Sequence, residues 1–532
     1  MAAMAVLALA AGIGLCVLFL DAGGGTDGEN APDAGAQAAQ EEPALAQRAD
    51  FLPSALRFGE RLPVTEFKTK DGGVRSLDEL RGKTLVLLFW GSWCPYCERV
   101  LERSAELERA LRAYPDTELI LIDKLDPDKG ETVEKAQRCL AQNGVGFESL
   151  YDEGLRAYAA YGMKRIPTAL VLDGNGYLRA MTAQPLTDGE ALRALLEDAR
   201  GGGATARFVR EHMTGEDGGV YTTYAARGGD SPTGRDVLSE SQGLAMVCAL
   251  LADDREWFDQ SYGYAKEKLE REGVFCWYAA ADGKRAGANA LIDDLRIYSA
   301  LRAADGRWGG YGAEAKALAT ALGGHNVSRG HLCGFYDFAQ KRVGNTVPLL
   351  TLDLSALRLL EEDAPGIAAA AREAEAILCG GYIGDDFPLY YASYDHKAKR
   401  YSHEDLNTSE ALTVLLHAVT AGVARRESLD WLARRVASGT LAARYDVSGR
   451  PVPGYAYDST AAYALAALIG ARAGDAELYT GARNRMENLH VAAGSPLAGA
   501  FSGREDGEDI IAFDQLLPLL VYSATADVVF EE

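Results

Sequence analysis

The chain has 532 residues, of which 48% are apolar, and a formal net charge of −23 at pH 7. This length exceeds that of one compact domain, so two or three domains with sizeable cores are expected. The acidic balance argues against nucleic-acid binding, which requires clustered Lys and Arg. Eight cysteines are too few for a disulfide scaffold in a chain of this size.

The chain starts with an apolar run over residues 1–20, close to the length that spans a bilayer. The first basic residue is Arg48, so the positive-inside rule gives no orientation. We predict a single-pass anchor in the cell membrane, with all later residues outside the cytoplasm; a cleaved signal peptide is the alternative. Residues 21–50 are rich in Gly, Ala, Glu and Gln and are predicted to form a flexible linker.

A Cys-Pro-Tyr-Cys motif, Cys94 to Cys97, follows a strand-like apolar run over residues 84–90 and opens a helical stretch over residues 98–113. The unpaired N–H groups and partial positive charge of a helix N-terminus lower the pKa of a thiol there. We therefore predict that Cys94 is the exposed nucleophile and that Cys97 is the buried partner that resolves the mixed disulfide. A metal site would need two further ligands in partner spacing, and the sequence has no second cysteine pair.

Several features around this motif resemble the thioredoxin-like fold, in particular its membrane-tethered, extracytoplasmic TlpA- and ResA-like branch. They are a buried strand at 118–123, an Ile-Pro-Thr segment at 166–168 and a hairpin with an Asn-Gly turn at 175–176. The resemblance covers residues 51–200 and implies an α/β domain, a cis-Pro167 loop that faces the cysteines, and a protein partner for thiol–disulfide exchange. Many thioredoxins bury an acid on the strand before the motif, but residues 84–90 contain none, so the proton acceptor for Cys97 is unassigned.

Residues 201–203 are three glycines, which mark a domain boundary, and the pattern becomes mostly helical from residue 206 to the C-terminus. Helices are predicted at 237–251, 257–269, 290–303, 313–322, 350–360, 367–378, 409–421, 429–437, 460–473, 476–489 and 512–524. This number of helices, with long loops between them, indicates an all-α toroid of helix pairs over residues 206–532.

Residues 239–246 read Ser-Glu-Ser-Gln-Gly-Leu-Ala-Met and resemble the Ser-Glu-Gly-Gln-Gly-Tyr-Gly-Met signature of glycoside hydrolase family 8. Further matches follow in the family order at residues 273–277, 289–297 and 449–463. The resemblance implies an (α/α)6 barrel that hydrolyses β-1,4-linked polysaccharide with inversion. It implies Glu240 as the general acid, Asp458 as the base that activates water, and Asp293 or Asp294 as the residue that holds the sugar at the cleavage subsite.

Two further site questions stay open. Glu404 is the rival base, because branches of the family differ in where that carboxylate comes from. Trp277 is predicted to contact substrate, since a flat aromatic face can stack on a sugar ring, although aromatic side chains also fill the ends of barrels.

Inversion needs two carboxyls about 6.5–9.5 Å apart and a protonated acid in a desolvated pocket. Ile292 and Arg296 stand where the family has acids, so a second hypothesis is a thiol–disulfide oxidoreductase whose barrel only binds glycan or protein. The seven histidines show no metal-ligand spacing, and we predict neither a metal nor a cofactor.

Overall fold

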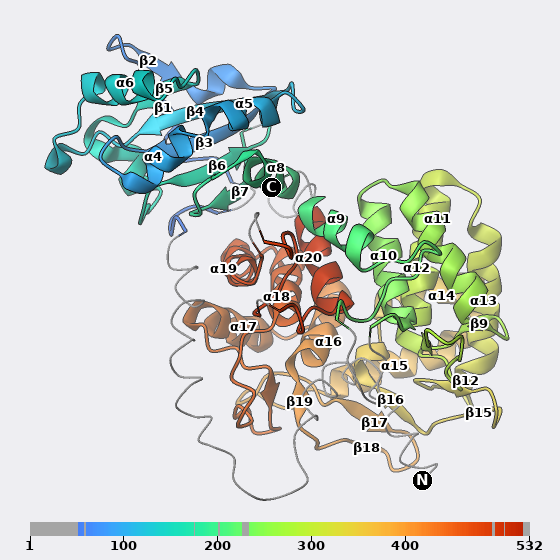
Figure 1. Cartoon of the computed structure of the whole chain (residues 1–532). Coiled ribbons are helices and arrows are strands. Elements are labelled where there is room, and N and C mark those ends of the chain that lie inside the picture. Colours follow the sequence, from blue (N-terminus) through green and yellow to red (C-terminus); the bar gives the residue numbers. More distant parts are fainter. Residues whose placement is uncertain are drawn as a thin grey trace, which may run out of the picture. The chain divides into compact units, whose positions relative to one another are not determined.

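The computed structural model describes residues 52–524, except 58–59, 175, 200–202, 226–233, 492–494 and 505. These residues divide into two compact units, with the division inside helix α9 (Gly203–His212). The first unit holds the described residues up to Arg207 and residues 487–500, and the second holds 208–486 and 501–523 (Figure 1). The predicted anchor and linker, residues 1–50, lie outside the described residues. None of the described helices combines the length and the hydropathy needed to cross a bilayer.

The first unit is built on a seven-stranded sheet in the order β2-β1-β5-β4-β3-β6-β7. The strands are β1 (Glu66–Lys68), β2 (Val74–Ser76), β3 (Thr84–Trp90), β4 (Thr117–Asp123), β5 (Glu148–Tyr151), β6 (Thr168–Leu172) and β7 (Leu178–Thr182). Strand β3 pairs in parallel with β4 and antiparallel with β6. All its residues except Thr84 are buried, because a strand covered on both faces is apolar throughout. This mixed sheet confirms the predicted thioredoxin-like α/β fold.

Five helices accompany this sheet: α4 (Pro95–Leu101), α5 (Ser104–Leu111), α6 (Val133–Gln142), α7 (Arg156–Ala160) and α8 (Gly189–Ala199). The single helix predicted over 98–113 is two helices, since the backbone leaves helical geometry at Arg103. It also begins earlier than predicted, at Pro95, because the fixed φ of proline suits the first position of a helix. The peptide bond between Ile166 and Pro167 is cis, as the resemblance implied.

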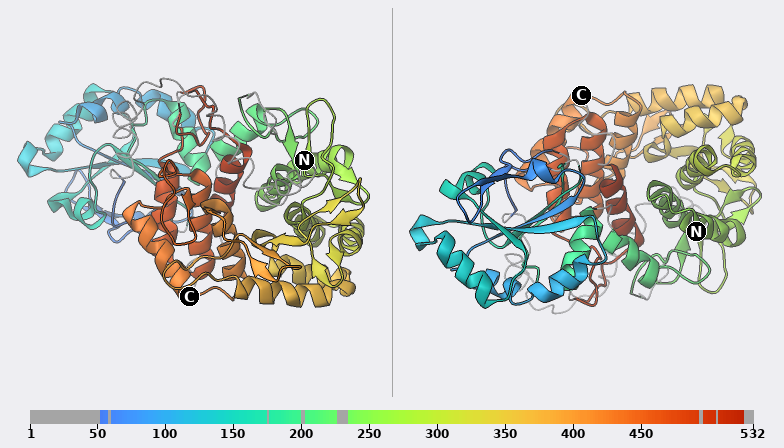
Figure 2. Two further views of the ribbon diagram at one scale, coloured as in Figure 1. Left: turned by 90° about the horizontal axis from the view of Figure 1, so that it is seen from below. Right: turned by 90° about the horizontal axis from the view of Figure 1, so that it is seen from above.

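The second unit is a ring of helix pairs. The inner helices are α10 (Ser239–Leu251), α12 (Leu291–Trp308), α14 (Leu354–Asp363), α16 (Thr408–Thr420), α18 (Thr460–Ala473) and α20 (Ala512–Ala524). The outer helices are α11 (Arg255–Tyr264), α13 (Gly312–His325), α15 (Ala368–Gly380), α17 (Arg426–Ser438) and α19 (Ala476–Glu487). In Figure 2 the colours pass around this unit from green through yellow and orange to red. The ring closes where Cys248 Sγ of α10 meets the Leu516 carbonyl oxygen of α20 at 3.5 Å. All the predicted helices are present, and the predicted toroid is confirmed.

Burial differs sharply between the inner helix α18 and the outer helix α17. Every residue of α18 from Thr460 to Ala471 is buried, whereas α17 buries only one face, with Trp431, Leu432 and Val436 pointing inward. An outer helix needs an apolar stripe, but a helix surrounded by neighbours must be apolar or small on all sides. The alanine-rich sequence of α18 meets this requirement and lets the neighbouring helices approach closely.

Short β-ladders lead directly into two of the inner helices, α10 and α16. Strand β8 (Val237–Leu238) leads into α10 and pairs with β11 (Tyr278–Ala279), and β19 (Leu406–Asn407) leads into α16 and pairs with β20 (Arg444–Tyr445). A three-stranded sheet joins β16 (Thr346–Pro348), β17 (Ser393–Asp395) and β18 (Arg400–Tyr401). The remaining pairs are β9 (Glu270–Arg271) with β10 (Val274–Phe275), β12 (Val327–Ser328) with β13 (His331–Leu332), and β14 (Tyr336–Asp337) with β15 (Arg342–Val343).

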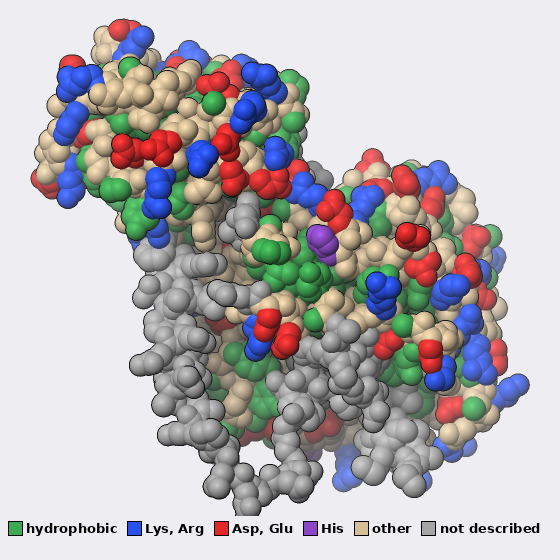
Figure 3. Space-filling model, in the orientation of Figure 1, with side chains coloured by type: hydrophobic (Ala, Val, Ile, Leu, Met, Phe, Trp, Pro, Cys, Tyr) green, Lys and Arg blue, Asp and Glu red, His purple; other side chains and the backbone are tan. Residues whose placement is uncertain are grey.

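Charged side chains of both signs are interspersed on the face of the molecule shown in Figure 3. Among the described residues, many charged side chains form surface ion pairs, such as Arg75 with Glu79 at 2.9 Å and Arg426 with Asp430 at 2.9 Å. Exposed pairs of this kind add little to stability, about 0.2–1 kcal/mol each. The fold therefore depends on the two apolar cores rather than on surface electrostatics.

The close approach of α18 to α19 generates a stability prediction. A Cβ added at Gly470 would lie 2.6 Å from the backbone nitrogen of Tyr479, and backbone cannot move aside as a side chain can. Overpacking of this kind costs about 1–3 kcal/mol, so Gly470→Ala should lower the melting temperature of the barrel transition in scanning calorimetry. The matched control is Gly323→Ala in α13, where the nearest atom would be at 3.6 Å. That variant should be neutral or more stable by up to about 1 kcal/mol, because alanine favours a helix. Equal melting temperatures for the two variants would contradict the prediction.

Candidate active sites

The dithiol lies at the junction of the central strand β3 and helix α4. Cys94 is the N-cap of α4, and the backbone N–H of Cys97 donates to Cys94 Sγ at 3.4 Å. The cis-proline loop approaches from the other side, with the Ile166 carbonyl oxygen 3.6 Å from Cys94 Sγ. The structure therefore brings the three predicted residues Cys94, Cys97 and Pro167 into one site.

The two thiols differ strongly in acidity. Hydrogen bonding from the Cys97 side chain, helped by the backbone N–H groups of Cys97 and Tyr96 and by the charge of Arg165, lowers the pKa of Cys94 to about 6. Burial raises the pKa of Cys97 well above its ordinary range, and the neighbouring Cys94 raises it further. A thiolate at neutral pH is therefore favoured at Cys94, which can attack, and disfavoured at Cys97.

The prediction that Cys94 is exposed was wrong. Only 5% of Cys94 is exposed, against 1% for Cys97. The reason is tertiary: the loop at Ile166, 72 residues away in sequence, covers the sulfur. A partner must therefore dock close to this loop in order to reach Cys94.

A buried acid stands behind the dithiol, although the strand before the motif contains none. Asp123 is the last residue of β4 and lies beside Trp90 in the parallel β3–β4 ladder. Burial, together with the adjacent Glu131, raises the pKa of Asp123 to about 8, and its charge in turn raises the pKa of Cys97. Glu131 accepts hydrogen bonds from the Ser92 N–H at 3.0 Å and the Ser92 hydroxyl at 2.7 Å. The sequence did carry a signal for Asp123: it is the only acid at the end of the second predicted buried strand, which pairs with the strand before the motif.

In the second unit, Glu240 is the second residue of inner helix α10 and is 4% exposed. Burial raises the pKa of Glu240 to about 8, and the nearby carboxyls of Asp293, Glu410 and Asp514 act in the same direction, whereas Arg296 opposes them. Its Oε2 atom is buried and has no hydrogen-bond partner among the described residues. Glu240 is therefore a carboxyl that holds its proton near neutral pH, as a general acid must.

The two adjacent acids of α12 differ in their surroundings. Asp293 accepts a hydrogen bond from the Ser239 hydroxyl at 2.6 Å and pairs with Arg296 at 3.2 Å, so it lies beside the start of α10. Asp294 is fully buried and accepts from the Phe275 N–H at 2.9 Å and from the Asn289 amide at 2.6 Å. Both acids accept hydrogen bonds from the protein through both carboxylate oxygens, but only Asp293 is among the carboxyls that raise the pKa of Glu240.

The other predicted residues lie in the segments between the helices. Trp277 is half-buried, and its carbonyl oxygen accepts from the Ser239 N–H at 3.1 Å, which places its backbone beside α10. Asp458 is exposed, immediately before the N-cap Ser459 of α18, and accepts from the Tyr463 hydroxyl at 2.8 Å. Glu404 is exposed in the segment between β18 and β19.

Two further acids that influence Glu240 were not predicted. Glu410 is in the first turn of α16, and Asp514 is in the first turn of α20. The Ala461 N–H donates to Asp514 at 3.0 Å, and burial raises the pKa of Asp514 to about 7. The signal in the sequence was an acid two residues after the start of an apolar helix, a pattern that Asp293 shares.

Comparisons with known proteins agree with the two predicted domains. Residues 58–181 match the model of the AhpC/TSA family, and residues 204–329 match that of the glycosyl hydrolases family 8. The chain joins a thioredoxin-like domain to a family 8-like domain. Both are families of enzymes.

Individual relatives match one or the other domain. The Bacillus subtilis protein named "Putative lipoprotein YdaJ" is 26% identical over 321 residues, 59% of this chain and 84% of that protein. The thiol-disulfide oxidoreductase ResA of Halalkalibacterium halodurans is 30% identical over 125 residues, 23% of this chain and 66% of that protein. A solved structure described as a novel alpha-amylase from Clostridium perfringens is 27% identical, with a TM-score of 0.56, and the match covers 61% of this chain and 97% of that one.

The hydrogen bond from Cys97 to Cys94 gives the first site prediction. Because that bond is the largest influence lowering the pKa of Cys94 to about 6, Cys97→Ala should raise it toward the ordinary value of 9.0. The pH dependence of Cys94 alkylation, followed by mass spectrometry, measures this shift. The matched control is Cys139→Ala, which removes a thiol of the same domain and should leave the midpoint for Cys94 unchanged. A midpoint that stays near pH 6 in Cys97→Ala would contradict the assignment.

Asp123 gives the second site prediction. Its pKa rises from 3.8 to about 8 on folding, so the folded state holds the proton more tightly than the unfolded state. The resulting stability is fully present below about pH 4 and is lost as the pH rises toward about 8. In Asp123→Asn the free energy of unfolding should decrease less as the pH rises, and the domain should be more stable than the unmodified one by roughly 1–3 kcal/mol at pH 8.5. Calorimetric melting from pH 5 to 8.5, with the exposed Asp128→Asn as control, tests it; parallel curves for Asp123→Asn and the unmodified protein would refute it.

Proposed function

We propose that the protein is anchored to the cell membrane through residues 1–20 and acts outside the cytoplasm as a thiol–disulfide oxidoreductase and a glycoside hydrolase. The apolar N-terminal run and the resemblance to tethered, extracytoplasmic thioredoxin-like proteins support the location. The difference in acidity between Cys94 and Cys97 supports the first activity, and the buried, protonated Glu240 supports the second.

In the exchange reaction the Cys94 thiolate attacks one sulfur of a partner disulfide and releases the partner's other sulfur as a thiolate. Cys97 then gives its proton to Asp123 in its carboxylate form and attacks Cys94 Sγ, which releases the second partner thiolate. The two partner sulfurs are reduced, and Cys94 and Cys97 become a disulfide. The same steps in reverse oxidise a partner dithiol. Asp123 suits the proton transfer because it is buried beside the dithiol, with a pKa of about 8.

In hydrolysis Glu240 donates its proton to the glycosidic oxygen, and Asp458 takes a proton from the attacking water, so that the anomeric configuration inverts. The observation that carries this proposal is the burial of Glu240 among further carboxyls, which keeps it protonated. Asp458 is exposed at the start of an inner helix, where water reaches it, and Glu404 is the rival base. Asp293 rather than Asp294 is proposed as the acid that contacts sugar, because Asp293 lies beside the start of α10 and its charge acts on Glu240.

The substrate proposed from the family resemblance is a β-1,4-linked polysaccharide. An α-linked glucan is the second candidate, since a solved structure 27% identical to this chain is described as an alpha-amylase. One observation favours the alternative that the barrel binds glycan or protein without cutting it. Arg296, which stands where the family has an acid, pairs with Asp293 at 3.2 Å and offsets its charge. Measuring reducing-sugar release from β-glucans, xylans, chitosans and starch separates these possibilities.

The role of Glu240 is tested on whichever polymer is cut. Glu240→Gln cannot donate a proton, and the loss should be about 10²–10⁴-fold in kcat with glycan binding nearly unchanged. In the unmodified protein kcat/KM should fall as the pH rises through about 8, where Glu240 loses its proton.

Matched variants complete this test. Glu267→Gln, an exposed acid of the same unit, should keep full activity. Asp458→Asn should lose activity comparably to Glu240→Gln, while Glu404→Gln should not; the reverse result would move the role of base to Glu404. The hydrolase proposal fails if no polymer is cut, or if Glu240→Gln keeps more than a tenth of the activity. In either case the alternative, a barrel that only binds glycan or protein, is favoured.

A further inference from the structure

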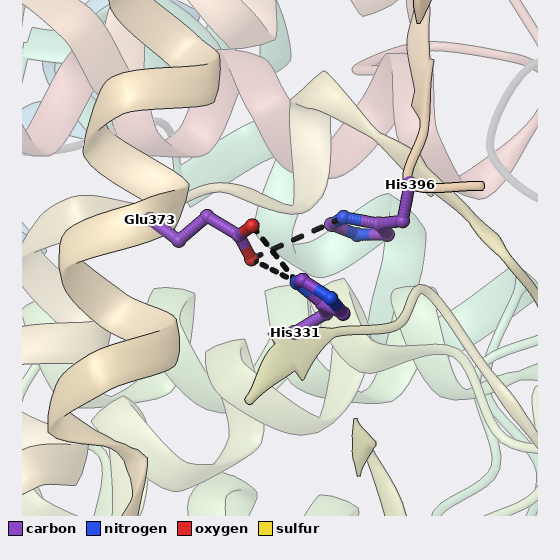
Figure 4. A group of neighbouring side chains, drawn as sticks. All are labelled: His331, Glu373 and His396. Atoms are coloured by element: carbon purple, nitrogen blue, oxygen red, sulfur yellow. Dashed lines mark hydrogen bonds and ion pairs between the residues drawn. The ribbon is translucent and has the colours of Figure 1, made fainter. Parts of the chain in front are cut away.

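Three potential metal ligands from separate parts of the second unit meet on its surface. His331 is in β13, Glu373 is in outer helix α15, and His396 is in the turn after β17 (Figure 4). Their ligand atoms all lie within 4.8 Å of one another. The two histidines are 65 positions apart in the sequence (396 − 331), so no local spacing motif links them.

The side chains point toward one another, as Figure 4 shows. His331 Nδ1 lies 2.8 and 2.6 Å from the two carboxylate oxygens of Glu373. His396 Nδ1 lies 3.9 Å from Glu373 Oε2, and the two imidazole rings stack with their centroids 4.7 Å apart. Two imidazole nitrogens and one carboxylate therefore converge on a single point.

The environment of His396 leaves one of its ring nitrogens without a hydrogen-bond partner among the described residues. Its side chain is only 6% exposed, and its Nε2 lies 2.9 Å from the Leu332 carbonyl oxygen. Because a carbonyl can only accept, Nε2 must carry the hydrogen, which leaves Nδ1 of the neutral ring as an acceptor. Nδ1 is buried and has no hydrogen-bond partner among the described residues. It faces a carboxylate oxygen at 3.9 Å, too far for a proton to bridge the two atoms.

We propose that His331, Glu373 and His396 form a binding site for a divalent transition-metal ion, with zinc as the best fit. Two imidazoles and one carboxylate are a ligand set that zinc accepts, with a water as the fourth ligand. The hydrogen bond from His396 Nε2 to the Leu332 carbonyl matches the support that metal-bound histidines usually receive.

The geometry requires only small movements to accept the ion. Ligand atoms about 2.0–2.2 Å from a tetrahedral zinc lie roughly 3.3 Å from one another. The contact of His331 with Glu373 at 2.6 Å must therefore lengthen by about 0.7 Å, and the 3.9 Å gap from His396 must shorten by about 0.6 Å. His331 and Glu373 are 39% and 33% exposed, which leaves a route for the ion and room for the water.

A metal here would add to the hydrogen bonds that already join three segments, such as the one from the Tyr401 hydroxyl of β18 to the Ile377 carbonyl oxygen of α15. The β12–β13 hairpin and the β17–β18 hairpin would both be fixed to α15. After β18 the chain continues through Glu404 and β19 into α16, which carries Glu410. The ion therefore has a structural role: it holds together the segments that lead into α16. This role does not depend on whether the barrel cuts glycan.

Zinc binding to the full chain tests the proposal. The protein is stripped with chelator, and the Cys94–Cys97 pair is oxidised so that the dithiol does not compete for metal. Titration calorimetry with zinc chloride should show one equivalent bound, and zinc should raise the melting temperature of the barrel transition. Glu373→Gln and His331→Gln should each weaken binding at least about tenfold and remove the thermal shift. His325→Gln, a histidine of the same unit outside the cluster, should bind as the unmodified protein does.

The proposal is overturned if the full chain takes up no zinc saturably, or if Glu373→Gln and His331→Gln bind zinc as tightly as the unmodified protein. Circular dichroism of the metal-free variants separates loss of a ligand from loss of the fold. His331, the most exposed of the three, is the substitution that decides the question if Glu373→Gln does not fold.

Discussion

Exclusion of water from a few acidic groups sets the chemistry at both candidate sites. Burial is the largest influence on the pKa of Glu240 and on that of Asp123, and it raises each to about 8. Each group also has a second carboxyl beside it, Asp293 in one case and Glu131 in the other, which acts in the same direction. Carboxyls that would be charged on the surface thus become proton donors or acceptors near neutral pH.

Helix starts carry both sites, yet they act differently on the two reactive groups. Cys94 caps α4, and the Cys97 side chain, helped by the N–H groups there, lowers its pKa, because a thiolate accepts their hydrogen bonds. Glu240 is also in a first turn, where the helix dipole stabilises a negative charge by about 0.3–1 kcal/mol. A rise of its pKa from 4.5 to about 8 outweighs that effect, since each pKa unit corresponds to about 1.4 kcal/mol. Burial therefore decides the state of Glu240, and hydrogen bonding decides that of Cys94.

The ring of helices explains why so many acids influence one residue. Glu240, Asp293, Glu410 and Asp514 all occupy the first turns of inner helices, and a short ladder or a single β-bridge lies just before each of these helices. A small shift of any ladder would change the field at Glu240. The chain limits such shifts with hydrogen bonds between the helix starts, such as Ser239 to Asp293 and Ala461 to Asp514.

The sequence by itself determined the elements and the nature of each domain. Apolar periodicity gave β3 and the helices of the ring, and the Cys-Pro-Tyr-Cys and Ser-Glu motifs gave Cys94, Cys97 and Glu240, because these signals are local. Only the tertiary structure decided what depends on distant neighbours. It covered Cys94 with the Ile166 loop, placed Asp123 behind the dithiol, tied Asp294 to Asn289 and brought His331, Glu373 and His396 together. Burial and charge at a site come from segments many residues apart, and periodicity along the chain carries no information about which of them meet.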